Sequence, residues 1–164
     1  MFELTERRVY YIDTDMQKKE RKVIKIKWHP LFKEKPPRHG SYLVTIADYE
    51  NYVGIRKYSI WNRWCKYSIW NRWKNHDIIA WAELPEPFDS RKKSNFKKDW
   101  HSYPGEKPGI YGAYLSTVVT KKKRSVSISL WLPTTDRFFD EGGHSIIAWA
   151  ELPDPYWEED YEGD

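Results

Sequence analysis

The chain has 164 residues, 28 Lys and Arg against 24 Asp and Glu, a formal net charge of +4, and one cysteine, Cys65. One cysteine excludes an intrachain disulfide framework and fits a reducing compartment. No apolar run reaches the length of a membrane-spanning helix, and no signal-type apolar core follows Met1, so we expect a soluble protein that does not bind a membrane.

The charge is distributed unevenly along the chain. The last residues, 154–164, contain six acids and no Lys or Arg. With these six set aside, 28 basic residues face 18 acidic ones, a formal net charge of +10. A like-charged tail is typical of a solvated chain end, and the alternative is that it folds back and screens a basic face.

Residues 1–27 predict an N-terminal β-hairpin. Arg8–Asp13 and Arg21–Trp28 are rich in Val, Tyr and Ile, and a polar turn separates them. Ile24 and Ile26 alternate with lysines, which suits a strand that is solvated on one face.

From residue 28 onward the chain contains an internal duplication. IIAWAELPEP at Ile78–Pro87 recurs as IIAWAELPDP at Ile146–Pro155, and Trp28-His29 recurs as Trp100-His101. This pattern predicts module 1 at 28–89, a basic linker at 90–98, module 2 at 99–157 and an acidic tail at 158–164. Each module has about 60 residues, near the lower limit for a separate core, so we expect a rigid pair with pseudo-twofold symmetry.

The sequence of each module predicts a short antiparallel β-meander. Alternating or β-branched runs between turn residues place strands at 41–46, 52–60, 78–83, 113–120, 125–131 and 146–151. The prolines after the last strand of each module end it, because proline donates no ladder hydrogen bond, and the exits are expected to run extended along a sheet edge. The predicted fold is mostly β: two tandem antiparallel meander modules plus the N-terminal hairpin, with one or two short helices at most.

A second duplication lies inside module 1, at 57–74. KYSIWNRW at Lys57–Trp64 recurs at Lys66–Trp73, and Arg137-Phe138 of module 2 is matched to Arg72-Trp73. An odd period of nine reverses the face of every side chain on a strand, so a turn must interrupt the two copies, and we predict a protruding hairpin bent near Asn62–Lys66. Because Trp, Tyr and Arg dominate binding hot spots, the candidate protein-binding residues are Tyr58, Trp61, Arg63, Trp64, Tyr67, Trp70, Arg72 and Trp73. The alternative is that half of these rings pack inward.

Basic residues in two strips are candidates for nucleic-acid contact. Lys and Arg bind phosphates, and nearby Trp and Tyr offer stacking surfaces for bases. The residues are Arg91, Lys92, Lys93, Lys97, Lys98, Lys121, Lys122, Lys123 and Arg124.

Signatures of catalysis are poor, since the chain has no Gly-rich phosphate loop, nucleophile elbow or HExxH motif. The duplication matches His29 with His101 and His76 with His144, and we interpret them as hydrogen-bonded residues at strand ends, with metal binding or catalysis as the alternative. We predict a non-enzymatic protein with no catalytic residue, no metal and no cofactor.

The motifs Gly40–Thr45 and Ile79–Pro87, repeated at Gly112–Leu115 and Ile147–Pro155, resemble a small domain of unknown function that is common in phage and prophage genes and ends in a W-x-x-L-P-x-P motif. Ala82-Glu83 stands where that family has Met-Pro. The resemblance covers most of both modules and brings no known catalytic residues. It implies a phage or mobile-element accessory protein in the cytoplasm of a bacterial host cell.

Three functions follow as expectations. The first is an inhibitor of a host protein, an anti-CRISPR or other anti-defence protein whose partner is a defence nuclease or its guide-RNA complex. The second is a protein that binds single-stranded nucleic acid. The third is a sponge or enzyme for a nucleotide signal, with a pocket between the modules lined by His29, His101 and tyrosines. The oligomeric state does not follow from the sequence.

Overall fold

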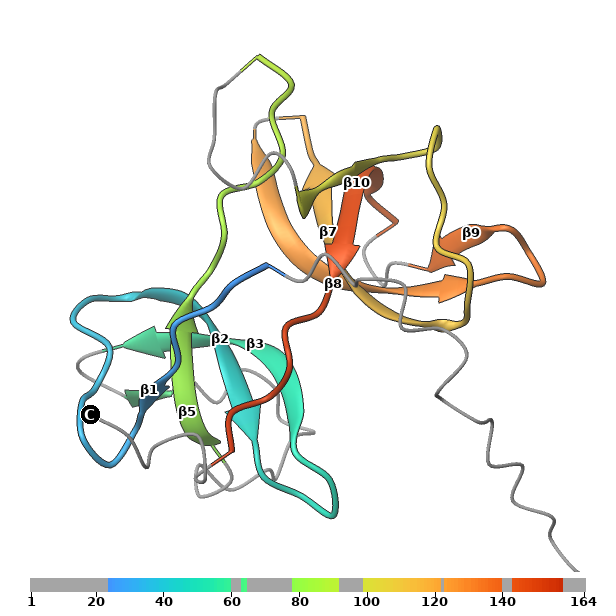
Figure 1. Ribbon diagram of the computed structural model, residues 1–164. Helices are drawn as coiled ribbons and strands as arrows, with labels where there is room; N and C mark the ends of the chain where they lie inside the picture. The colour runs from blue at the N-terminus through green and yellow to red at the C-terminus, as the bar shows by residue number, and fades with distance from the viewer. Residues whose placement is uncertain are drawn as a thin grey trace, which may run out of the picture.

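The computed structural model describes residues 24–59, 63–64, 78–91, 99–121, 123–139 and 143–157, with backbone only at 63–64 (Figure 1). All ten elements in these ranges are β-strands, and they form two five-stranded antiparallel sheets. The prediction of a mostly-β fold is therefore confirmed.

The two sheets have the same topology. In module 1, β1 (His29–Pro30), β2 (Gly40–Ile46), β3 (Tyr52–Ser59), β4 (Arg63–Trp64) and β5 (Ile78–Glu83) are arranged in the order β1-β5-β2-β3-β4. In module 2, β6 (His101–Ser102), β7 (Gly112–Val119), β8 (Arg124–Leu132), β9 (Arg137–Phe139) and β10 (Ser145–Glu151) are arranged in the order β6-β10-β7-β8-β9. The six predicted strands agree with the observed ones to within one residue at each end.

The register of the strands repeats as well, including an irregularity. Thr45 pairs with Ala80 but Ile46 pairs with Ile78, and in module 2 Thr117 pairs with Ala148 but Val118 pairs with Ile146. Each last strand therefore carries a one-residue bulge at the same position. The duplication extends from sequence to backbone geometry.

The register also changes one alignment made from the sequence. Tyr58 pairs with Trp64 just as Trp131 pairs with Phe138, so Arg63-Trp64 and not Arg72-Trp73 is the counterpart of Arg137-Phe138. The pairing places the reversal of the chain between Ser59 and Arg63, earlier than the centre of the predicted bend near Asn62–Lys66. The physical reason is that β3 has a free edge, and the first Arg-aromatic pair after it closes that edge.

Alternate side chains of each sheet enter different cores, as the two-residue period of a strand requires. On β2, Leu43 points to a central cluster that both modules share, and Tyr42 and Val44 point to a cluster within module 1. The buried members of the central cluster are Ile24, Leu43, Ala82, Trp100, Leu115, Ala148 and Ala150. Each sheet thus has one face on its own small core and one face on the core between the modules.

The described part of the N-terminal hairpin is not a strand. Ile24 is buried in the central cluster, Ile26 and Trp28 pack against it, and Lys25 and Lys27 are exposed. The predicted alternation is present, but residues 24–28 make no ladder, because their apolar side chains fill the space between the sheets. Residues 1–23 lie outside the described range.

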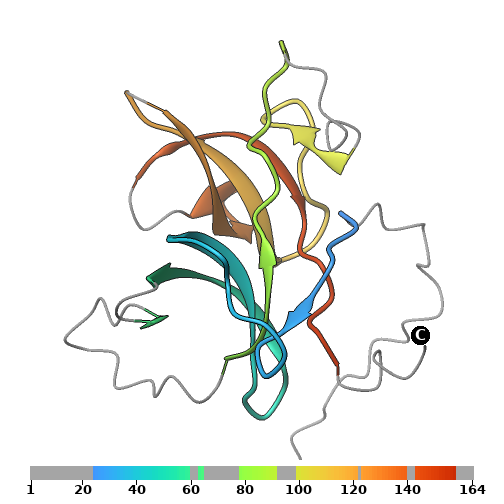
Figure 2. The ribbon, with the colours of Figure 1, turned by 90° about the vertical axis from the view of Figure 1, so that its left-hand side faces the viewer.

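The segments after β5 and β10 cross from one module to the other. We call residues 84–91 strap 1 and residues 152–157 strap 2. Figure 1 shows strap 1 (green) rising from the lower sheet to the upper one, and strap 2 (red) descending in the opposite sense. In Figures 1 and 2, strap 2 lies beside the segment 24–28, and Trp28 Nε1 donates a 3.0 Å hydrogen bond to the Asp154 carbonyl. The predicted path along a sheet edge is therefore replaced by an exchange between modules.

Candidate functional site

His29 and His101 form the same structural contacts in their two modules. The His101 ring stacks on Trp149 with centroids 4.3 Å apart and an interplanar angle of 20°, and its Nδ1 lies 2.7 Å from Glu106 Oε2. Trp149 Nε1 in turn donates a 2.9 Å hydrogen bond to the Glu106 carbonyl. Together these contacts hold the turn after β6 against β10.

Module 1 repeats the arrangement with His29, Glu34 and Trp81. His29 stacks on Trp81 at 4.4 Å and 16°, its Nδ1 contacts the Glu34 carboxylate, and Trp81 Nε1 donates a 2.9 Å hydrogen bond to the Glu34 carbonyl. His76 lies outside the described residues. Among those described, no group of three or more His, Cys, Asp or Glu residues could hold a metal ion. The repetition of His29 as His101 is thus explained by contacts that stabilise the fold of each module.

Strap 1 is held on module 2 through the backbone of one residue. The Phe88 N–H donates a 2.9 Å hydrogen bond to Thr117 Oγ1, and the Phe88 carbonyl accepts a 3.2 Å bond from Arg124 Nη1. Because both backbone groups are bound by side chains of the other module, we call this arrangement clamp 1.

Strap 2 is held on module 1 in the same way. The Tyr156 N–H donates a 2.9 Å hydrogen bond to Thr45 Oγ1, and the Tyr156 carbonyl accepts a 3.3 Å bond from Asn51 Nδ2. We call this arrangement clamp 2. Ile46 pairs with Tyr52 as Val118 pairs with Ser125, so Asn51 occupies the position of Arg124. The two modules therefore close each other reciprocally.

An open depression of about 570 Å³ lies beside clamp 1. Its polar lining comes from strap 1 and from the β7–β8 turn, and consists of Glu86, Asp89, Arg91, Thr120, Lys123 and Arg124. Thr120 closes the turn, since its N–H donates a 3.0 Å hydrogen bond to the Lys123 carbonyl and its Oγ1 accepts a 3.3 Å bond from the Lys123 N–H. The position of Lys123 at the rim is thereby set by the turn. We call this surface the basic depression.

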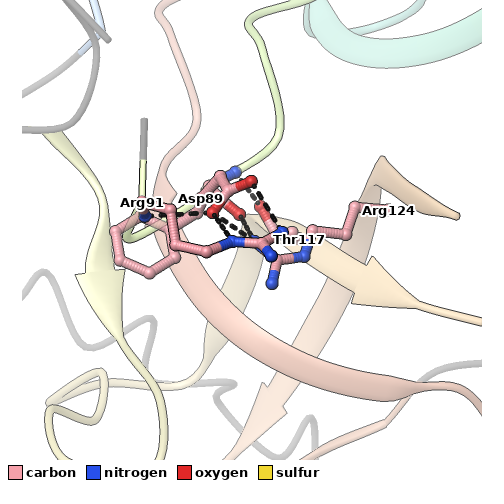
Figure 3. A network of polar contacts seen from close by, with 5 residues as sticks. Asp89, Arg91, Thr117 and Arg124 are labelled. Carbon is pink, nitrogen blue, oxygen red and sulfur yellow. Dashed lines mark hydrogen bonds and ion pairs between the residues drawn. The ribbon is translucent and has the colours of Figure 1, made fainter. Parts of the chain in front are cut away.

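Asp89 orders the two arginines of the basic depression (Figure 3). Its Oδ1 lies 3.2 Å from Arg91 Nε and 3.0 Å from Arg124 Nη1, and its side chain is only 12% exposed. The hydrogen bond from the Arg91 side chain, that from the Arg91 backbone N–H and the Arg124 charge lower the pKa of Asp89 to about 2. The same bond raises the pKa of Arg91. The carboxylate therefore stays ionised and holds both guanidinium groups in place.

The lining contains three basic and two acidic residues, so its formal charge is +1. Lys121 and Lys123 are both exposed, and neither makes an ion pair with any described residue. The arrangement presents oriented guanidinium groups and solvated ammonium groups to solvent. These groups suit an anionic surface or a phosphate.

Some residues of the two basic strips predicted for nucleic-acid contact lie together in the structure. Arg91 from the linker strip lies with Lys123 and Arg124 from the other, and Lys121 is exposed in the same turn. The remaining residues of the prediction lie outside the described ranges: Lys92, Lys93, Lys97, Lys98 and Lys122.

Of the predicted aromatic hairpin, the structure describes only its start. Tyr58 is buried in the core of module 1, where its ring meets Tyr42 edge-on with centroids 6.4 Å apart. The backbones of Arg63 and Trp64 form β4. The rest of the candidate set lies outside the described residues: Trp61, Tyr67, Trp70, Arg72 and Trp73.

Sequence reasoning did not find Asp89 or the clamp threonines. One signal was present: Pro87-Phe88 and Pro155-Tyr156 are matched Pro-aromatic pairs, and Thr45 and Thr117 are matched too. Neither His29 nor His101 lines the basic depression, so it differs from the nucleotide pocket that the sequence suggested.

No family model matches the chain, and comparisons with curated proteins and with solved structures gave no match. No helix in the described part of the chain has the length and apolar character needed to cross a membrane.

Proposed function

We propose that this protein is a non-enzymatic accessory protein of a phage or other mobile element, which binds a host protein and inhibits it as an anti-CRISPR or other anti-defence inhibitor. The observation that supports a binding role is the gathering of Arg91 with Lys123 and Arg124 at one depression, although Arg91 comes from the linker and the other two from module 2. Such a surface suits a partner with negative charge at its surface. In this proposal the partner is a defence nuclease in the bacterial cytoplasm, which is bound at an acidic face of its surface, or its guide-RNA complex.

The comparison of the two modules also favours binding. Matched side chains, such as His29 and His101, make the same internal contacts twice. The exposed side chains next to the two clamps differ: Lys121 and Lys123 lie on the β7–β8 turn, and acidic residues lie on the β2–β3 turn. A repeated scaffold with different surfaces at its two ends is expected when those surfaces meet different chemistry.

Charge reversal at the rim of the depression tests the proposal. Defence nucleases purified from the bacterial host are assayed with the wild-type protein, with Lys123→Glu, and with the matched control Lys27→Glu, an exposed lysine outside the depression. We expect Lys123→Glu to weaken inhibition about tenfold, or about 1.4 kcal/mol, and Lys27→Glu to leave it unchanged. If wild-type protein inhibits none of the nucleases, or if both variants inhibit equally, the proposal is wrong.

A second candidate is single-stranded nucleic acid, and the exposure of Arg91 next to Lys121 and Lys123 favours it. Lysines and arginines that neutralise phosphates release counterions, so the affinity would fall steeply with log salt, with a slope of about −0.7 per contact. Titration of a fluorescent single-stranded oligonucleotide at several salt concentrations distinguishes the two functions. Lys123→Glu would reduce the slope by about 0.7 if Lys123 contacts a phosphate.

A further inference from the structure

Clamp 2 has a surface chemistry that differs from that of clamp 1. Trp157 follows the clamped Tyr156, at the position where Asp89 follows Phe88. The turn before Asn51 carries Asp48 and Glu50, where the corresponding turn of module 2 carries lysines. The scaffold is the same at both ends, but basic groups at one end are replaced by aromatic and acidic groups at the other.

Three aromatic rings are exposed around clamp 2. Tyr49 is fully exposed, Trp157 is 51% exposed and Tyr52 is 41% exposed. Tyr49 lies in the β2–β3 turn and Tyr52 begins β3, and the hydrogen bond from Asn51 Nδ2 to the Tyr156 carbonyl brings the end of strap 2 to that turn. A hydrogen bond of 2.9 Å from the Tyr49 N–H to Asp48 Oδ1 orders the turn itself. Clamp 2 therefore brings Trp157 to the turn that carries Tyr49, whereas Tyr52 pairs with Ile46 and lies on the face of the sheet opposite to Thr45 and strap 2.

The carboxylates define which partner fits this surface. Asp48 and Glu50 are exposed, and no Lys or Arg lies between Ile46 and Ile55. Aromatic rings attract guanidinium and ammonium groups through their π-faces, and adjacent carboxylates add ion pairs. The same carboxylates repel phosphates, so a nucleic acid is disfavoured here. We call Asp48, Tyr49, Glu50 and Trp157 the aromatic-acidic end.

We propose that the aromatic-acidic end is a docking surface for a Lys- or Arg-bearing segment of a partner protein. Charge complementarity selects this occupant, because only a cationic side chain satisfies both the rings and the carboxylates. Figure 1 shows the β2–β3 turn at the lower end of the molecule and the β7–β8 turn at the upper end. The protein therefore has two oppositely charged surfaces, and the aromatic-acidic end acts independently of the basic depression.

A titration of the full chain with hexa-arginine, followed by ¹H–¹⁵N correlation spectra, tests the proposal. We expect shifts of the backbone amides of Tyr49–Tyr52 and of the Trp157 indole. A chain carrying both Tyr49→Ala and Trp157→Ala should bind the peptide about five- to tenfold more weakly, since each exposed cation–π contact contributes a modest amount. Hexalysine should bind more weakly than hexa-arginine, because Arg stacks on rings better than Lys does.

Controls separate this surface from general charge attraction. Tyr111→Ala removes another exposed tyrosine, 64% exposed and located in module 2, and should leave the affinity unchanged. Glu50→Gln should weaken binding without changing the spread of the spectrum, which shows that folding is intact. Shifts confined to residues 158–164, or an equal effect of Tyr111→Ala, overturn the proposal. Because the inhibition assay of Lys123→Glu probes the other surface, failure here leaves the proposed function untouched.

Discussion

Thr45 Oγ1, completely buried in module 1, accepts a 2.9 Å hydrogen bond from the backbone N–H of Tyr156, which lies 111 positions later in the chain. Thr117 and Phe88 make the same contact in the opposite direction. Each module thus supplies the segment that closes the other. This exchange, together with the central cluster that both modules share, makes the pair a single unit of folding.

Replacement of a clamp threonine by valine should destabilise the whole protein. Valine has nearly the same shape, so Thr45→Val leaves the Tyr156 N–H buried without its acceptor, at a cost of about 1–3 kcal/mol, and Thr117→Val does the same to Phe88. Urea unfolding measures the change as a lower midpoint with one cooperative transition. Thr135→Val, which loses only an exposed hydroxyl contact, should change stability by less than about 0.5 kcal/mol. Equal stabilities of all three variants would contradict the role of the clamps.

Cleavage of the linker should leave the two modules associated. With a protease site placed within residues 92–98, the cut full-length protein should elute from a gel-filtration column at the volume of the uncut protein. The reason is that the central cluster and both straps cross between the modules, whatever the covalent link. Separation should require denaturant. Elution of two smaller species under native conditions would show that the modules are independent.

The fold was largely predictable from the sequence because the repeated motif carries it. Gly40–Ile46 is a β-prone run entered through Pro and Gly residues, and Ile78–Glu83 runs into Leu84-Pro85, so local signals mark both strands. The short strands β1 and β6 were missed. Their two residues are recruited by pairing with β5 and β10, which no local pattern records.

The clamps and the basic depression were less accessible to sequence reasoning. Phe88 was assigned to module 1, and only the tertiary structure shows that its backbone binds Thr117 of module 2. Charge clustering did identify Arg91 and Arg124, but not Asp89, because a single carboxylate between basic strips carries no pattern. Its role depends on three-dimensional convergence, which places it 3.0 Å from an arginine 35 positions away in the sequence.

Asp89 should make stability depend on pH in a defined window. Its pKa is lowered from 3.8 to about 2, so the ionised form is favoured in the folded state, and the stability it contributes is present above pH 3.8 and is lost as the pH falls towards 2. The difference in urea midpoint between wild type and Asp89→Asn should therefore be largest near neutral pH and shrink across this window. Glu86→Gln removes a carboxylate of the same depression that makes no ion pair with described residues, and its difference should stay small. A difference for Asp89→Asn that is constant from pH 7 to pH 2 would contradict the assignment.

The matched histidines should matter for stability and not for inhibition. His29→Ala removes a ring stacked at 4.4 Å on Trp81, and His101→Ala removes its counterpart on Trp149, so each variant should lose about 0.5–1.5 kcal/mol. The two losses should be similar, since the surroundings are repeated, and nearly additive, since the sites share no contact. At a temperature where each variant remains folded, inhibition of the target nuclease should equal that of wild type. Loss of inhibition in a folded His29→Ala protein would instead restore the catalytic or metal-binding alternative for this residue, because the loss could then not be ascribed to the scaffold.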